Sequence, residues 1–205
     1  RWNFQAGWTG SMNLFLDVNS DLMINYSQIT GGLDRVSNSG LAPVNSGDWN
    51  GRFDRIRTVN YLLAHTDKVK RDAVSNHFIG EGYFFRAWNY YDFLVDYGDL
   101  PYITEPLNVD SEELYRPRDS RYEVAKRIIQ DLDSAIVNLS WKGVGEAKSG
   151  RVNKEAAIVM KARVALFEGT WEYYHGKGSS NFGVAGKDGK EFLNLVEPAI
   201  QELIA

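Results

Sequence analysis

The chain of 205 residues contains no cysteine, only three histidines and only five prolines. Without a thiol it can form neither a disulfide nor a thiolate-ligated metal site. The histidines, His65, His77 and His175, are scattered along the sequence and form no metal-binding motif. No apolar run approaches the roughly 20 residues that a helix needs to cross a bilayer. We therefore expect no metal, no other cofactor and no membrane-spanning helix.

A concentration of charge of one sign is also missing. The formal net charge is −4, and basic and acidic residues are interspersed. The longest basic cluster, Lys68 to Arg71, is short and is typical of a solvated helix end. A nucleic-acid-binding protein would show a basic stripe, so nucleic acid is not an expected partner. The chain also lacks His-Glu-x-x-His, Gly-x-Ser-x-Gly and Walker motifs, which predicts no catalytic residue and no enzymatic activity.

What the chain does have is aromatic residues at helical spacing, and aromatics make up 13% of it. A long helix from about residue 72 to 97 is predicted, and a helix so rich in aromatics must pack between other helices. Gly80 and Gly82 each lower its helix propensity by about 1 kcal/mol relative to alanine, which indicates that another helix approaches closely there. Two apolar stripes are expected in the core: Phe84, Ala87, Trp88, Tyr91 and Val95 on this helix, and Ala157, Met160, Val164, Phe167, Trp171 and Tyr174 on a later one.

These patterns predict an all-α fold of TPR-like helical hairpins, stacked into a right-handed superhelix with long irregular inserts. Asp48 is expected to cap the first hairpin, and Gly98 to end it. The chain starts without methionine and stops inside a helical pattern, so we expect a piece of a longer protein. The expected division is an irregular region with a short helix (1–47), a first hairpin (48–97), an extended insert (98–119), a second hairpin (120–175), and the start of a further helix (190–205).

Five ordered segments carry a family resemblance: 49–60 (WNGRFDRIRTVN), 80–87 (GEGYFFRA), 90–101 (YYDFLVDYGDLP), 118–135 and 150–167 (GRVNKEAAIVMKARVALF). Together they resemble the SusD/RagB family of outer-membrane nutrient-binding lipoproteins. Gly82 and Tyr83 depart from the family's signature, in which a small residue and a different neighbour stand there.

The resemblance implies that residues 1–205 are the N-terminal portion of one SusD-like domain. It also implies a location at the outer face of the outer membrane, held by a lipidated cysteine that this chain does not contain. Such proteins capture oligosaccharides or, in some members, peptides. They deliver them to a SusC-like, TonB-dependent transporter, which is the expected partner.

Candidate ligand-binding residues lie in and beside the irregular N-terminal region. An aromatic face beside amide and guanidinium donors suits a sugar ring, because C–H groups pack on the ring while hydroxyls take hydrogen bonds. Trp49 is also expected to pack at a helix start. The predicted set is Trp8, Tyr26, Arg35, Asn38, Asn45 and Trp49.

Two other functions remain open from the sequence. A TPR-type adaptor would bind proteins through a concave helical face, although the inserts at 99–119 and 140–152 are long for such an array. A helical glycoside hydrolase would need two carboxylates about 5–10 Å apart, and Glu81, Asp92 and Asp96 are candidates. For Glu81 and Arg86 we favour a structural role in fixing the helices through ion pairs.

Overall fold

A computed structural model describes residues 46–176 and 182–204 of the chain. The predicted ligand-binding residues Trp8, Tyr26, Arg35, Asn38 and Asn45 lie outside this part. The chain divides into two compact units, Arg1–Gly47 and Asp48–Ala205.

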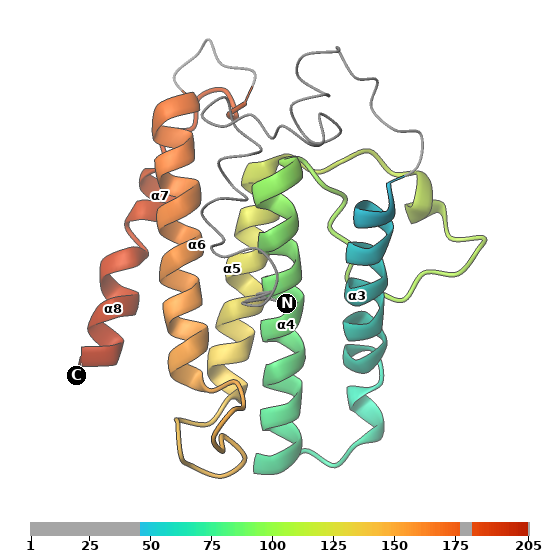
Figure 1. Ribbon diagram of the computed structural model, residues 1–205, viewed down its shortest axis with the longest axis vertical. Helices are drawn as coiled ribbons and strands as arrows, with labels where there is room; N and C mark the ends of the chain where they lie inside the picture. The colour runs from blue at the N-terminus through green and yellow to red at the C-terminus, as the bar shows by residue number, and fades with distance from the viewer. Residues whose placement is uncertain (1–45, 177–181, 205) are drawn as a thin grey trace, which may run out of the picture. The chain divides into compact units, whose positions relative to one another are not determined.

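The described residues form a stack of helices (Figure 1). No strand occurs in this part of the chain, where extended pairing is limited to one antiparallel bridge between Leu100 and Asp119. The predicted all-α class is therefore confirmed. The helices are α3 (Gly47–Leu63), η1 (Thr66–Lys68), α4 (Ala73–Tyr97), η2 (Glu112–Tyr115), α5 (Arg121–Asn138), α6 (Lys154–His175), α7 (Lys190–Leu193) and α8 (Val196–Ile204).

Local capping defines the ends of the long helices. The Asp72 side chain accepts a hydrogen bond from the Ser75 N–H and starts α4 with a capping box. Gly98 ends α4 at φ 69°, a backbone region that favours glycine. Asn153 caps α6 in the same way as Asp72 caps α4. The prediction for Asp48 was wrong, because α3 already begins at Gly47 and places Asp48 inside its first turn.

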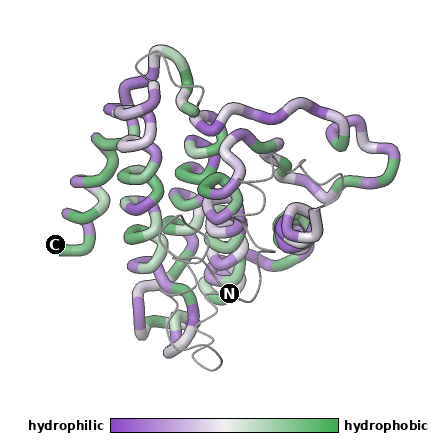
Figure 2. Tube along the Cα trace, turned by 45° about the horizontal axis from the view of Figure 1, so that its top comes forward, coloured by the Kyte–Doolittle hydropathy of each residue, from purple (hydrophilic) through white to green (hydrophobic). Residues whose placement is uncertain are grey.

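The core lies between α4, α5 and α6, and apolar and polar residues alternate along the helices that enclose it (Figure 2). The predicted stripe on α4 is partly wrong. Ala87 is buried, but Val95 is 45% exposed, and the fully buried face runs through Tyr90 and Leu94. The Tyr90 hydroxyl is satisfied inside the protein, because it accepts a hydrogen bond from the Ile103 N–H at 2.7 Å.

The predicted stripe on α6 fails at its C-terminal end. Ala157, Met160 and Val164 are buried, but Tyr174 is 75% exposed. The buried positions on the last turns belong instead to the charged residues Glu168 and Glu172.

The expected helix over 190–205 is interrupted between α7 and α8. Pro198 explains the break, because in a continuous helix its ring would collide with the carbonyl four residues earlier, that of Asn194.

Gly80 and Gly82 lie where the sequence predicts close helix contacts. A Cβ atom at Gly80 would come within 2.8 Å of Leu139 Cγ and 2.9 Å of the Leu139 backbone nitrogen. At Gly82 it would lie 2.9 Å from Leu63 Cδ2, at the end of α3. The two glycines therefore let α4 approach both the C-terminal end of α5 and that of α3.

Candidate functional site

Glu81 and Arg86, from the 80–87 segment, hold the scaffold together, as expected. Glu81 receives a hydrogen bond from Arg151 Nε at 2.9 Å, which ties the start of α6 to α4. Arg86 makes two hydrogen bonds to Asp131 on α5, and both side chains are buried. Burial opposes a charged guanidinium, but the hydrogen bonds and charge of Asp131 more than offset it and raise the pKa of Arg86.

A groove of about 430 Å³ lies between α3 and the insert that follows α4. α3 supplies one wall, and the extended chain around Pro101 and η2 supplies the other. Its apolar lining consists of Trp49, Phe53, Ile56, Pro101, Ile103, Leu107 and Leu114, and its polar lining consists of Asn50, Asp54, Arg57, Asn60, Glu105, Glu113, Arg116 and Arg118.

Trp49 is the one predicted ligand-binding residue in the described part of the chain, and it lines this groove. Its indole packs edge-on against Phe93, with ring centroids 4.7 Å apart, and against Tyr97 at 5.2 Å. Arg118 Cζ lies 4.8 Å from the Trp49 ring centroid, a cation–π distance. Trp49 therefore packs at the start of α3, as expected, and also contributes aromatic surface to the groove.

The polar side chains of the groove include charges of both signs. Some of these side chains are hydrogen-bonded to the wall, and others are exposed. Arg116 donates to Asp119 Oδ1 at 2.7 Å, and the Asn60 amide donates to the Ile103 carbonyl at 2.8 Å, so these groups support the wall. Arg57 and Glu113 are exposed at the groove. Apolar surface flanked by guanidinium, amide and carboxylate groups can pack against the C–H face of a sugar and bind its hydroxyls.

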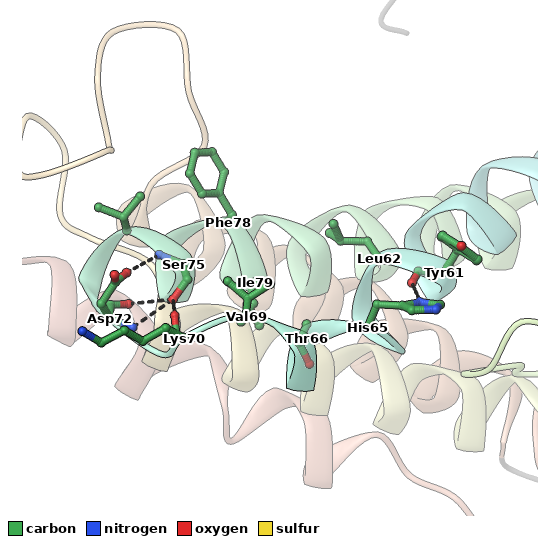
Figure 3. A pocket seen from close by; sticks show the side chains of 11 residues that line it. Tyr61, Leu62, His65, Thr66, Val69, Lys70, Asp72, Ser75, Phe78 and Ile79 are labelled. Carbon is green, nitrogen blue, oxygen red and sulfur yellow. Dashed lines mark hydrogen bonds between the residues drawn. The ribbon is translucent and has the colours of Figure 1, made fainter.

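A second cavity, of about 560 Å³, lies at the turn between α3 and α4 (Figure 3). Its surface is mostly apolar, with Leu62, Val69 and Phe78 among its lining residues. Lys70 and the Asp72–Ser75 capping box lie at one end (Figure 3). Its shape and apolar lining suit a hydrophobic group rather than a hydroxylated one.

The three carboxylates considered for a hydrolase all accept hydrogen bonds from arginines. Glu81 and Asp92 lie on one continuous helix and are separated by about 16 Å along its axis at 1.5 Å per residue. Asp92 and Asp96 both accept hydrogen bonds from the guanidinium of Arg52, and Asp92 does so at 2.9 Å. This arrangement stabilises the contact between α3 and α4.

Neither a metal site nor a membrane span emerges from residues 46–176 and 182–204. No cluster of three or more histidine, aspartate or glutamate side chains there is arranged to hold a metal ion. No helix in the same residues is both long and apolar enough to cross a membrane.

Comparison with known proteins identifies the family. The family model described as "Starch-binding associating with outer membrane" matches residues 12–166, most of the chain. The chain belongs to the SusD-like family. Among curated SusD-like relatives, protein P25 of Formosa agariphila is 28% identical over 131 residues, which cover 62% of this chain and 24% of that protein. The chain spans about a quarter of the length of the curated relatives it matches.

Solved structures share the SusD-like fold. A crystal structure with xylogluco-oligosaccharide matches at a TM-score of 0.63 and 22% identity, covering 86% of this chain and 33% of that one. A laminarin-binding SusD-like protein matches at a TM-score of 0.56 and 24% identity, covering 74% and 35%. The shared fold confirms the predicted TPR-like helical hairpins with inserts.

Several groove residues were not predicted from the sequence. Arg57, Arg118 and Glu113 are ordinary surface charges in the sequence, and only the folded insert brings Glu113 and Arg118 beside Arg57 of α3. The prolines at 101 and 106 predict an extended segment, and this was the available signal for a second wall facing α3.

Proposed function

We propose that this chain is part of a non-enzymatic, cell-surface binding protein that captures glycans and passes them to a TonB-dependent transporter in the outer membrane. The observation that carries the proposal is the family match over residues 12–166, whose description combines starch binding with the outer membrane. Two proteins of the same fold support a glycan ligand, since one was solved with xylogluco-oligosaccharide and the other is laminarin-binding. A peptide ligand remains the alternative.

The groove between α3 and the insert is the proposed contact surface in the described residues. It has the aromatic ring of Trp49 and the exposed guanidinium of Arg57 on the same wall. A ring and a planar donor together suit a pyranose, whose axial C–H groups lie on its faces and whose equatorial hydroxyls project around its rim. The role of the helices is to hold this wall rigid.

The proposal is tested by isothermal titration calorimetry on the protein expressed from its complete reading frame. The panel contains starch, xyloglucan and laminarin oligosaccharides and mixed peptides. We expect binding of at least one glycan, without release of reducing ends over prolonged incubation. Binding of peptides alone, or release of reducing ends, would overturn the glycan-capture proposal.

A matched pair of variants tests the groove itself. Arg57→Ala removes a groove guanidinium, whereas Arg55→Ala removes an exposed guanidinium of the same helix that does not line the groove. We expect Arg57→Ala to weaken glycan binding about fivefold to tenfold, as for the loss of a hydrogen bond to a ligand, and Arg55→Ala to leave it unchanged. Equal effects of the two variants would place the ligand elsewhere.

The transporter is tested separately by co-purification. An affinity-tagged form of the full protein, extracted from its native outer membrane in mild detergent, is expected to retain a TonB-dependent transporter. Recovery of the protein alone, under conditions that preserve other outer-membrane complexes, would argue against the handover step while leaving glycan binding intact. A TPR-type adaptor would instead recover other protein partners and bind no glycan.

A further inference from the structure

Two glutamates one helical turn apart on α6 are fully enclosed by protein. Glu168 and Glu172 both have 0% of their surface exposed. Glu168 is held by Arg121 of α5, whose Nε donates at 2.9 Å and whose Nη2 donates at 2.8 Å. The Arg121 guanidinium also lies 3.9 Å from the ring centroid of Trp171. One buried cation therefore faces two buried carboxyl groups, and its hydrogen bonds go to Glu168.

Glu172 is left with one unsatisfied oxygen. Its Oε2 accepts a hydrogen bond from the Val184 N–H at 3.2 Å, but its buried Oε1 has no hydrogen-bond partner among the described residues. An ionised carboxylate can only accept hydrogen bonds, whereas a protonated one can donate. A proton on Glu172 would give this oxygen a partner in the Glu168 carboxylate, the neighbour with which Glu172 interacts. Protonation thus removes the unsatisfied group and one of the two buried negative charges.

The same geometry favours the protonated form near neutral pH. Burial raises the pKa of Glu172 to about 7. The hydrogen bond from Val184 and the charge of Arg121 act to lower it, and the negative charge of Glu168 acts to raise it.

The segment that covers Glu172 is packed directly on α6. A Cβ atom at Gly176 would collide with the Lys187 carbonyl, and one at Gly189 would collide with the Gly169 carbonyl. The Trp171 indole N–H donates to the Phe182 carbonyl at 2.7 Å. The backbone of residues 182–189 therefore lies too close to α6 to admit water beside Glu172. Hydrating an ionised Glu172 requires this segment to move away.

Other charged and titratable groups on the surrounding elements are engaged elsewhere or exposed. Lys187 Nζ lies 3.7 Å from the Tyr122 ring centroid, and Asp188 pairs with Lys190 at 2.9 Å. The ring of His175, another ionisable side chain of α6, lies 4.5 Å from that of Trp171. Further ionisable groups on the surrounding elements include Tyr91 on α4, Asp99 before α5, Lys126 on α5, Glu191 on α7, and Glu197 and Glu202 on α8.

We propose that one proton held between Glu168 and Glu172 fastens residues 182–189 to α6, and that loss of this proton at alkaline pH releases the segment. The contact is closed at pH 6, where the pair carries one negative charge opposite Arg121. At pH 8 the pair carries two, and the open, hydrated arrangement gains population. This pH-dependent contact depends on the packing of residues 182–189 against α6 and is independent of the proposed glycan function.

Hydrogen–deuterium exchange of peptides covering residues 182–189, corrected for the intrinsic pH dependence of exchange, tests the proposal on the protein expressed from its complete reading frame. In the wild type we expect the opening equilibrium to rise about tenfold between pH 6 and pH 8, the change for one proton lost from the closed state with a raised pKa. Peptides from α5 should change far less and serve as an internal reference.

Three variants identify the side chain that causes the pH dependence of exchange. Glu172→Gln keeps a donor toward Glu168 and cannot titrate, so its exchange should be the same at both pH values. Glu168→Gln removes the neighbouring charge and should also flatten the response, which provides a second readout if Glu172→Gln does not fold. His175→Gln should retain the wild-type response. A response that persists in Glu172→Gln, disappears in His175→Gln, or is absent from the wild type would overturn the proposal.

Discussion

Arg86 on α4 holds Asp131 on α5 through two hydrogen bonds, from Nε at 2.7 Å and from Nη2 at 2.6 Å. The remaining nitrogen, Nη1, donates to Asn60 Oδ1 on α3 at 3.2 Å and to the Thr104 carbonyl of the insert at 3.3 Å. One buried guanidinium therefore joins three helices and the insert. Its position in the 80–87 segment explains how a helix-forming sequence also fixes the relation between the two hairpins.

Removing this guanidinium should destabilise the folded protein. We expect Arg86→Met to lower the free energy of unfolding by about 3–5 kcal/mol, because Asp131 would remain buried without its partner. The double variant Arg86→Met with Asp131→Leu should recover part of that loss. Urea denaturation of the three proteins measures both effects. A loss for Arg86→Met no larger than that of the surface variant Arg55→Ala would contradict this view of the pair.

Glycine substitutions should have opposite signs at two sites. Gly80→Ala places a methyl group against the backbone of Leu139, and we expect a loss of about 1–3 kcal/mol from the forced shift. Gly51→Ala, in α3, meets nothing within 4 Å and should stabilise the protein by up to about 1 kcal/mol through helix propensity. Thermal unfolding followed by circular dichroism distinguishes the two. Stabilisation by both variants would show that α4 and α5 can separate at little cost.

Acid sensitivity should arise in part at the contact between α3 and α4. Partial burial acts to raise the pKa of Asp48, but hydrogen bonds from Tyr97 and Arg52 outweigh it and lower the pKa from its ordinary value of 3.8. A carboxyl group with a lowered pKa in the folded state stabilises the protein above its unfolded pKa, and this contribution is lost as the pH falls through the folded pKa.

We therefore expect Asp48→Asn to lose stability at pH 7 and to show a weaker decline than the wild type below about pH 4. Asp54→Asn, on the same helix but outside the Arg52 cluster, is the matched control. The measurement is the urea midpoint between pH 2.5 and pH 7. Identical acid profiles for Asp48→Asn and the wild type would mean that this carboxylate adds nothing to acid sensitivity.

Trp49 is expected to contribute to stability independently of any ligand. Its edge-on contacts with Phe93 and Tyr97 are each worth about 0.5–1.5 kcal/mol beyond the area they bury, so Trp49→Ala should lower the free energy of unfolding by about 2 kcal/mol. Trp49→Phe should restore much of it. If both variants bind glycan as tightly as the wild type does, after correction for the folded fraction, Trp49 acts only as a packing residue.

The helices themselves could be predicted because their determinants are local. Asp72 caps the start of α4 and Gly98 caps its end, each through contacts within a few residues. The expected range of 72–97 differs from the observed helix by one residue. The buried face of α6 could not be predicted in full. Glu168 and Glu172 are ionisable, and Glu168 is tolerated inside because the fold brings Arg121 to it from a distant part of the sequence.

The candidate site was less accessible from the sequence than the fold. Trp49 was predicted from its aromatic ring and its position beside an irregular region, both of which are local properties. The groove, in contrast, exists only because the insert returns to α3, so the contribution of Arg118 depends on a tertiary contact. The five other predicted ligand-binding residues fall outside the described part of the chain and stay predictions.

The insert between α4 and α5 begins and ends at the same place. The Leu100 N–H donates to the Asp119 carbonyl at 3.1 Å, and the Asp119 N–H donates back to the Leu100 carbonyl at 2.9 Å. This pairing fixes the two ends of the insert, and its first residues, Tyr102 to Thr104, are held by the core through Arg86 and Asp131. The stretch beyond Thr104 can be lengthened, shortened or replaced and so reshape one wall of the groove, while the closure entropy changes only slowly with length. The shape of this wall is thereby separated from the packing of the helical scaffold.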